Sequence, residues 1–233
     1  MSRATVLRRL RAANPTLTIR EVTSRAFERY GRVLRGMRAD AAVGYARRNA
    51  RVADEVVYEP SVTGLERDKA FRRAVEHRVY GGMPVQIGWC YGRNSRLDAL
   101  EYHKGVEVVV AVTDTVVIVG DLRDLRWTHT GPTYRSAQAE VFYLPRGLTV
   151  EFHAWCLHFA PIHVCTRQGF VTLVVLPQGT NTDVVRPARA RGEERLLFAR
   201  NKWLVAHREA APLVEQGAVV GITGRNTRVA PVD

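Results

Sequence analysis

The sequence predicts a mainly β protein in which a helical N-terminal piece precedes an antiparallel barrel or jelly roll. From Met83 onward, short runs rich in β-branched residues follow one another, each bounded by Gly, Pro, Asn or Asp. No helical segment separates these runs, so the crossover connections that a parallel sheet requires are missing. Closely spaced antiparallel strands usually close into a barrel or a jelly roll.

Residues 1–80 carry the apolar spacing of amphipathic helices. We expect helices over 6–10, 25–34, 39–49 and 67–77, the second of them after a cap at Thr23 or Ser24. Residues 1–20 hold five arginines and no acidic residue, a composition that also matches a mitochondrial presequence. We favour a short basic helix that ends at Asn14 and Pro15. Residues 1–80 are therefore predicted to be a helical extension packed on the barrel.

Eight strands are expected in the second part of the chain. They cover residues 84–90, 99–103, 106–112, 115–119, 139–144, 148–153, 157–165 and 170–176. Residues 179–192 are rich in Thr, Asn, Pro and Arg and are predicted to be a loop. The apolar stripe of residues 193–207 is predicted to dock on the barrel. The barrel is thus expected to span residues 81–207, and residues 208–233 form a C-terminal segment.

The composition excludes several classes of protein. The chain has 233 residues, of which 46% are hydrophobic, and its formal net charge is +12. Arginines alternate with acidic residues, as in 66–69 and 121–124, so the basic stripe of a nucleic-acid-binding protein is not expected. The longest apolar runs have the length of strands, which excludes a membrane-spanning helix from our expectations. Three cysteines leave at least one thiol unpaired, so a cytoplasmic location is predicted.

The first candidate site is the segment 100–107. If it continues as a strand, Glu101, His103 and Glu107 share one face, and Tyr102 and Lys104 share the other. Two carboxylates and an imidazole on the inner face of a barrel are unfavourable unless a cation binds them. A divalent metal is one such cation, and an edge strand with a hydrated polar face is the alternative.

A second cluster follows a turn formed by Pro145 and Gly147. The segment that follows this turn in the sequence contains His153, His158 and His163 among bulky apolar residues. His158 has the most apolar neighbours and is the first choice for a functional residue. His153 and His163 are expected to be structural.

The two clusters together resemble the cupin superfamily. Its first motif is His-x-His followed by Glu, and its second is Pro-x-Gly followed by another His. Glu101 stands where the first histidine of the cupin motif is expected, and His103 and Glu107 take the other two positions. The resemblance implies a cupin jelly-roll barrel and metal ligands at Glu101, His103, Glu107 and His158. Mn²⁺ or Zn²⁺ suits a set of two carboxylates and two imidazoles.

A closer resemblance extends over most of the chain. The runs at 30–34, 82–88, 100–104, 157–161, 176–182 and 201–204 look like a bacterial cupin family long known only as a domain of unknown function. That family is associated with the breakdown of sulfosugars, and one of its types serves as sulfoquinovose isomerase. The resemblance therefore implies a metal-dependent aldose–ketose isomerase, an anionic sugar as its partner, and a homodimer or larger assembly.

Isomerisation moves a proton between C1 and C2, so a proton-transfer residue is expected near the metal. Glu151 is the first candidate for this residue, and Lys104 is a second candidate catalytic residue. If Glu151 is a metal ligand, Glu107 becomes the next candidate base. A hydride shift is an alternative route.

The candidate substrate-binding residues are basic or amide side chains near the motifs. They are Arg93, Arg96 and Lys202 for a sulfonate, and Gln86 and Asn94 for sugar hydroxyls. Cys90 and Cys156 are expected to be small buried apolar residues. Other functions remain open at this point: another cupin epimerase or lyase, an Fe²⁺ oxygenase, or a barrel that binds sugar without catalysis.

Overall fold

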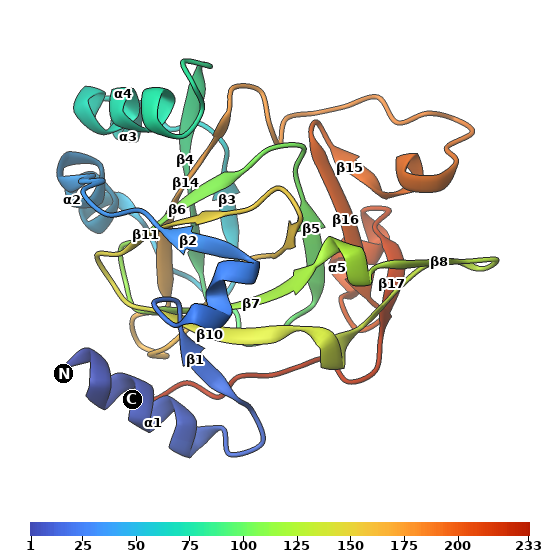
Figure 1. The fold of residues 1–233 in the computed structure, drawn as a ribbon, viewed down its shortest axis with the longest axis horizontal. Helices are drawn as coiled ribbons and strands as arrows, with labels where there is room; N and C mark the ends of the chain where they lie inside the picture. Colours follow the sequence, from blue (N-terminus) through green and yellow to red (C-terminus); the bar gives the residue numbers. More distant parts are fainter.

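The computed structural model describes residues 1–233 and is mainly β, with two sheets that face each other and a third sheet at one side (Figure 1). The first sheet has the order β1-β10-β7-β12, and β13 also pairs with β7. Its strands are β1 (Ile19–Glu21), β7 (Thr115–Asp121), β10 (Glu140–Leu144), β12 (Cys156–Leu157) and β13 (Ile162–His163).

The second sheet has the order β2-β11-β6-β14-β4-β3. Its strands are β2 (Gly31–Val33), β3 (Val57–Glu59), β4 (Val85–Gly92), β6 (Glu107–Ala111), β11 (Thr149–Phe152) and β14 (Phe170–Pro177). The long central strands carry the β-branched residues from which the sequence predicts them. Most pairs are antiparallel, as expected for strands joined without crossover helices.

The third sheet has the order β15-β16-β17-β9-β8, and β5 pairs with β16. Its strands are β5 (Ala99–Tyr102), β8 (Arg126–Thr128), β9 (Gly131–Arg135), β15 (Leu197–Ala199), β16 (Lys202–His207) and β17 (Val219–Thr223). The apolar residues of 193–207 thus belong mostly to strands. The β8–β9 hairpin extends from the body of the molecule (Figure 1).

The interior between the first two sheets is the barrel core. Val109 of β6, Val117 of β7, Phe142 of β10 and Phe152 of β11 meet there. Alternate residues of the same strands point outward, since successive side chains of a strand take opposite faces. This arrangement is a mainly antiparallel barrel of two sheets, as the sequence predicts.

Helices cover the outer faces of the barrel (Figure 1). They are α1 (Arg3–Ala13), α2 (Asp40–Asn49), α3 (Thr63–Glu66) and α4 (Lys69–Arg78), whereas α5 (Ala211–Glu215) packs on the third sheet. Buried residues of α2, α3 and α4 pack on outward-facing residues of the second sheet. α1 lies beside the C-terminal end of the chain, where Asn14 donates a hydrogen bond to the carbonyl of Ala230.

Within residues 1–80 the structure adds three short strands, β1 to β3, to the expected helices. The predicted helix over 25–34 is wrong beyond residue 29: the 3₁₀ helix η1 (Arg25–Arg29) ends there and β2 follows. Glycine suits position 31 in the β2–β11 pair, because a Cβ there would lie 2.1 Å from the carbonyl oxygen of Glu151. None of the helices combines the length and apolar character needed to cross a membrane.

Candidate metal centre

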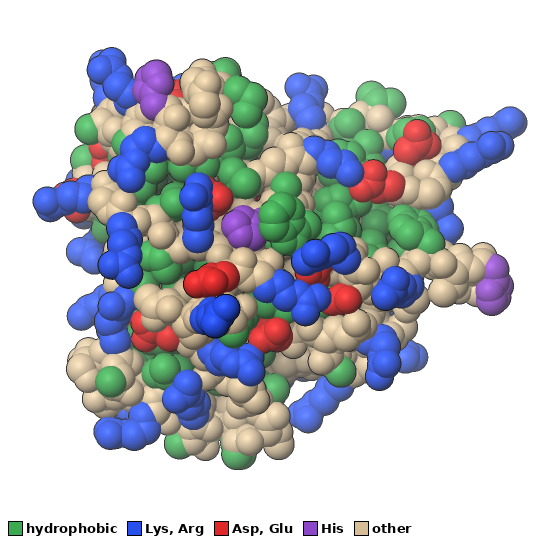
Figure 2. All heavy atoms as spheres, in the orientation of Figure 1, with side chains coloured by type: hydrophobic (Ala, Val, Ile, Leu, Met, Phe, Trp, Pro, Cys, Tyr) green, Lys and Arg blue, Asp and Glu red, His purple; other side chains and the backbone are tan.

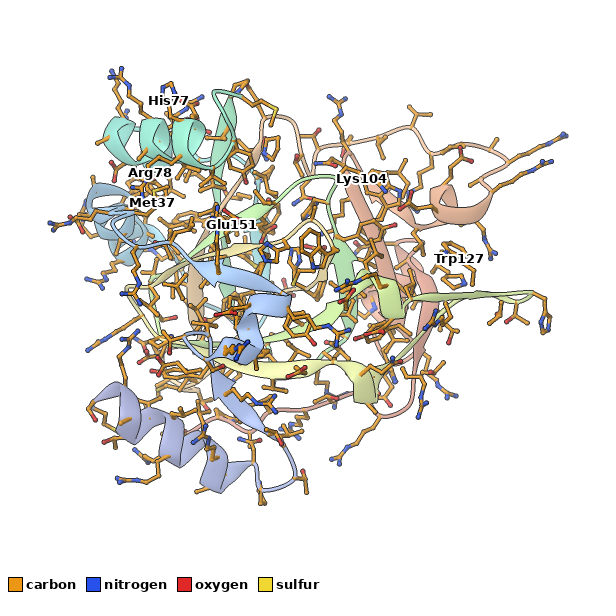
Figure 3. All side chains as sticks on the ribbon, viewed as in Figure 1. Met37, His77, Arg78, Lys104, Trp127 and Glu151 are labelled. Atoms are coloured by element: carbon orange, nitrogen blue, oxygen red, sulfur yellow. The ribbon has the colours of Figure 1, made fainter.

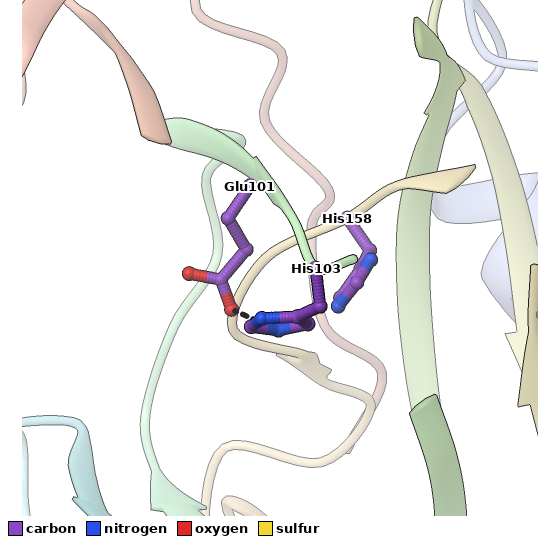
Figure 4. A group of neighbouring side chains, drawn as sticks. All are labelled: Glu101, His103 and His158. Atoms are coloured by element: carbon purple, nitrogen blue, oxygen red, sulfur yellow. Dashed lines mark ion pairs between the residues drawn. The ribbon is translucent and has the colours of Figure 1, made fainter. Parts of the chain in front are cut away.

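Three buried side chains bring nitrogen and oxygen donors together inside the barrel (Figure 4). They are Glu101 on β5, His103 directly after β5, and His158 directly after β12, and one ligand atom from each lies within 4.8 Å of the others. Glu101 and His158 are held side by side by paired backbone hydrogen bonds of 2.6 and 3.0 Å. The group could therefore hold a metal ion.

Hydrogen bonds orient both imidazoles toward the centre. Nδ1 of His103 lies 2.7 Å from the carbonyl oxygen of Asn201, and Nδ1 of His158 lies 3.0 Å from that of Cys156. A carbonyl oxygen can only accept, so Nδ1 carries the proton in each ring. The two buried Nε2 atoms have no hydrogen-bond partner. Histidine ligands of metals show this arrangement, in which one nitrogen donates to a carbonyl and the other binds the ion.

Glu107 is the fourth member of the cluster. Its Oε2 atom lies 3.2 Å from Nε2 of His103 and 3.3 Å from Nε2 of His158. Two ligands about 2.1 Å from one metal ion lie roughly 3.0–3.4 Å apart in octahedral or tetrahedral geometry. The Oε1 atom of Glu101 is slightly farther from Nε2 of His103, at 3.9 Å. Glu101, His103 and His158 thus form one candidate set of ligands, and Glu107 lies at a ligand-to-ligand distance from both imidazoles.

The electrostatics of the cluster also favour a bound cation. Burial opposes the charged form of Glu107, but His158 and His103 outweigh this effect and hold the pKa of Glu107 well below its usual range. Burial likewise opposes a charge on His158, and Glu107 nevertheless raises the pKa of His158 well above its ordinary value. Glu107 therefore draws a cation to the imidazoles, whether a proton or a metal ion.

The structure brings the predicted residues of segment 100–107 together, although the expected strand is not continuous. β5 ends at Tyr102 and pairs with the third sheet, whereas β6 begins at Glu107 and belongs to the second sheet. The turn between them brings His103 and Glu107 together.

A cavity of about 30 Å³ adjoins the cluster. Glu101, Glu107 and His158 line it together with apolar residues of β6, β7, β11 and β14. Among the lining residues, Tyr58, Phe159 and Ala160 are only half-buried, so the way to the solvent lies between β3 and the segment after His158. The volume suits one water molecule or an ion and is far below that of a pocket for a sugar.

Lys202 is the one predicted substrate-binding residue that lies at this cluster. Its ammonium group forms an ion pair with Oε2 of Glu101, and its side chain is 15% exposed. The rings of Tyr58 and Phe159 lie 5.9 and 5.7 Å from the ammonium nitrogen. The structure thus gives Lys202 a position beside a metal-binding carboxylate.

Glu151 does not reach the cavity, and its predicted role as the base is a misassignment. It lies on β11 opposite Val108, which packs under the helices on the outer face of the sheet. Its carboxylate accepts hydrogen bonds of 3.2 and 2.8 Å from Nε and Nη2 of Arg32. The neighbouring Val150 and Phe152 point into the barrel instead, because side chains alternate along the strand.

Lys104 is also turned away from the cluster. Its side chain is 53% exposed, forms an ion pair of 2.7 Å with Glu193, and lies over the rings of Tyr102 and Trp203. Lys104 and Glu151 lie in separate parts of the molecule (Figure 3). Neither residue is placed to move a proton at the cluster.

The other four predicted substrate-binding residues have structural partners. Gln86 is buried and is bonded through both ends of its amide to the backbone of Gly179 and Thr180. Asn94 donates to the carbonyl of Ala160 at 3.1 Å and so supports the segment at the cavity mouth. Arg93 pairs with Asp54, and Arg96 with Glu209.

Sequence reasoning missed Tyr58, Asn181 and Asn201. Tyr58 lines the cavity, and its hydroxyl accepts a 2.9 Å hydrogen bond from the side chain of Asn181. Asn181 and Asn201 have left-handed backbones, with φ of 62° and 54°. Both residues lie in runs that resemble the bacterial family, 176–182 and 201–204. The sequence alone assigns them no function. Non-glycine residues in this conformation are uncommon and gather at functional sites, which is the signal that a structure adds.

The basic side chains are distributed over the visible surface, with acidic side chains between several of them (Figure 2). Arginines at the surface also form pairs within the protein, such as Arg29 with Asp124 and Arg38 with Asp40. Much of the positive charge is therefore balanced locally.

The fold and the buried Glu-His-His group define a mainly β barrel with a candidate metal centre. Residues 19–227 match the family described as "Domain of unknown function (DUF4867)", and the chain belongs to this family. No curated protein matches the sequence.

Solved structures with similarity to this chain are distant from it. The α-ketoglutarate-dependent epimerase SnoN from nogalamycin biosynthesis is 14% identical, with a TM-score of 0.42 over 82% of this chain and 95% of that chain. HygX from Streptomyces hygroscopicus, with nickel, 2-oxoglutarate and hygromycin B bound, is 12% identical, with a TM-score of 0.39 over 74% and 95%. An 11S globulin from Wrightia tinctoria is matched over only 20% of its own length, at a TM-score of 0.27.

Proposed function

We propose that this protein is a metal-dependent sugar isomerase that converts an aldose into its ketose. The observation that carries the proposal is the buried convergence of two carboxylates and two imidazoles, both of whose Nε2 atoms face Glu107. The sequence resemblance to a family that includes sulfoquinovose isomerase supplies the substrate. The reaction is then the conversion of sulfoquinovose to 6-deoxy-6-sulfofructose.

Glu101, His103, Glu107 and His158 would hold one divalent ion, with Mn²⁺ or Zn²⁺ as the expected metals. When bound, this ion supplies Lewis-acid stabilisation of the negative charge that develops on O1 and O2 of an enediolate. Barrel walls of Val109, Val117 and Phe152 exclude water around the cluster, which strengthens electrostatic interactions there.

Tyr58 is the residue in the cavity to which we assign proton donation, since neither Glu151 nor Lys104 reaches this position. Burial raises the pKa of its hydroxyl, so the group is protonated at neutral pH. Asn181 donates to the Tyr58 oxygen, which leaves the proton of Tyr58 free for an acceptor in the cavity. Cys90 also lines the cavity, but this thiol is buried and burial raises its pKa, so it stays protonated.

A sugar needs more room than the cavity of about 30 Å³. The half-buried residues at the mouth, Tyr58, Phe159 and Ala160, are the ones that must move when substrate enters. Two of them are aromatic, which suits the apolar C–H faces of a sugar ring.

Metal content and product identity together test the proposal. Wild type, His103→Ala and His77→Ala are purified without chelators, analysed for metals and incubated anaerobically with sulfoquinovose, and the product is identified by NMR. His77 is exposed on α4 and serves as the matched control. We expect about one metal ion per chain and ketose formation in wild type and His77→Ala, with both lost in His103→Ala.

Three results would contradict the proposal in different ways. Wild type without metal after reloading would favour a barrel that only binds sugar. A product with an inverted or eliminated carbon centre would favour an epimerase or lyase. Turnover that requires oxygen would favour an oxygenase.

A further inference from the structure

Lys202 is the cationic side chain at the candidate metal centre. The long stem of a lysine normally carries its ammonium group into water. Here the ammonium group stays beside Glu101 and between the rings of Tyr58 and Phe159, with only 15% of the side chain exposed. Burying a charge in this way is costly, so its position needs a specific reason.

The fold holds Lys202 through the same turn that orients a candidate metal ligand. Lys202 follows Asn201, whose backbone carbonyl accepts the hydrogen bond from His103 and whose φ is 54°. The side chain of Asn201 ties this turn to Lys104 and Thr180 with hydrogen bonds of 2.8 and 3.1 Å. Lys202 and His103 are thus fixed relative to each other.

The two oxygens of Glu101 face different side chains. Oε1 points toward the imidazole of His103, and the other oxygen points away from both histidines (Figure 4). Lys202 contacts this second oxygen, Oε2. Its ammonium group therefore lies on the side of the cluster next to Tyr58 and Phe159, where the cavity meets the solvent.

We propose that Lys202 is a catalytic residue that binds the reacting end of the substrate, at the oxygen on which negative charge develops. This inference rests on the proposed isomerase function and changes the role that the sequence suggests for Lys202. A sulfonate on C6 lies at the opposite end of the sugar from C1 and C2. A lysine in contact with a metal-binding carboxylate would instead lie near C1 and C2, where the reaction takes place.

Charge balance supports this role. The carboxylates of Glu101 and Glu107 neutralise a divalent ion, so the loaded cluster would be neutral without Lys202. The ammonium group adds one positive charge to a site with apolar walls, where charges interact more strongly than in water. A site with this charge favours an oxyanion over the neutral sugar, which is the differential stabilisation that lowers a reaction barrier.

Two possible roles of Lys202 predict opposite effects on metal affinity. If Lys202 only tethers Glu101, its loss lets a ligand move and weakens metal binding. If Lys202 is a substrate-directed cation, it repels the metal ion, and its loss leaves metal binding equal or tighter.

The test compares wild type with Lys202→Met, Lys202→Arg and Lys69→Met. Methionine keeps the apolar stem without the charge, arginine keeps the charge, and Lys69 is exposed on α4 and serves as a matched control. Circular dichroism and thermal unfolding establish that each variant is folded. Metal affinity is measured for Mn²⁺ and Zn²⁺ by competition with a chromophoric chelator, and kcat and KM are measured with sulfoquinovose.

For Lys202→Met we expect metal affinity equal to wild type or up to about tenfold tighter, and kcat reduced about 10²–10³-fold with KM within threefold. Lys202→Arg should recover at least tenfold in kcat, and Lys69→Met should match wild type. Metal affinity weakened more than tenfold in Lys202→Met would overturn the inference in favour of a tether. An increase in KM with unchanged kcat would also overturn it.

Failure of the proposed function has a separate signature. In that case wild type itself does not form ketose, whatever the variants do. The sign of the change in metal affinity in Lys202→Met still decides between a tether and a free cation.

Discussion

Glu107 and Glu151 lie on neighbouring strands of one sheet and are buried to the same degree, yet they have opposite surroundings. Their side chains are 7% and 6% exposed. In the β6–β11 pair, Glu107 lies opposite Phe152, and Glu151 lies opposite Val108. Glu107 faces the imidazoles inside the barrel, whereas Glu151 faces Arg32 on the outside. A shift of one position along a strand exchanges these faces.

The comparison shows two ways to make a buried carboxylate acceptable. Glu151 has a permanent cation in a two-point contact with the Arg32 guanidinium, so it needs nothing further. Glu107 has two imidazole nitrogens that attract an exchangeable cation. Only the second arrangement can take up a metal ion, because a metal ion cannot replace an arginine side chain.

Matched glutamine substitutions at Glu107 and Glu151 test most directly whether the two carboxylates have different roles. Glu107→Gln removes a charge and a candidate ligand, so we expect metal affinity to fall about 100-fold or more, with loss of turnover. Glu151→Gln should keep metal affinity and turnover within about twofold and lower the free energy of unfolding by about 1 kcal/mol, since Arg32 is largely exposed. Chelator competition, sugar conversion and urea unfolding measure the three quantities. Loss of turnover in Glu151→Gln alone would return that residue to the reaction.

Asn201 offers a smaller perturbation of the inner cluster. Its left-handed backbone directs a carbonyl to Nδ1 of His103. Asn201→Gly can keep this conformation, whereas Asn201→Ala strains it. We expect metal affinity to fall about tenfold in Asn201→Ala and by less than threefold in Asn201→Gly, measured by chelator competition. Equal losses in both variants would mean that the side chain, and not the backbone, supports His103.

Asp121 extends the comparison to a third buried carboxylate, which also relies on permanent cations. Hydrogen bonds from the Arg123 guanidinium contribute most, and with those from its backbone N–H and from Arg29 they outweigh burial and hold the pKa of Asp121 well below its usual range. The folded pKa thus lies below the unfolded value of about 3.9, so the stabilisation is present above pH ~4 and disappears as pH falls through the folded pKa.

Asp121→Asn should therefore lower the free energy of unfolding at pH 7 by about 1 kcal/mol, because both arginines are partly exposed. The difference from wild type should shrink as the pH approaches 3. Urea unfolding at pH 7, 5 and 3 measures it, and a difference that stays constant over this range would show that Asp121 acts through packing and not through its charge.

The sequence predicts the central strands well because β-branched runs determine them locally. It also identifies Glu101, His103, Glu107 and His158, which the structure brings together. The sequence does not show which face of the sheet carries Glu151. Glu107 and Glu151 each stand between apolar residues and have the same local pattern. Tyr58 and Lys202 join the cluster through contacts between distant segments, and the strand of Tyr58, with three residues, is too short to show a period.

Lys104 and Lys202 provide the most selective test of the difference between a surface residue and a residue of the buried cluster, and the smallest expected effect. The two lysines flank the same pair of strands, but Lys104 contacts Glu193 at the surface and Lys202 contacts Glu101 in the interior. An exposed ion pair contributes little to stability, and a side chain that does not reach the cavity contributes little to turnover. Lys104→Met is therefore expected to change kcat, KM and metal affinity by no more than about twofold. A tenfold fall in kcat would mean that the surface next to Trp203 takes part in substrate binding. The functional site would then include Lys104 as well as the buried cluster.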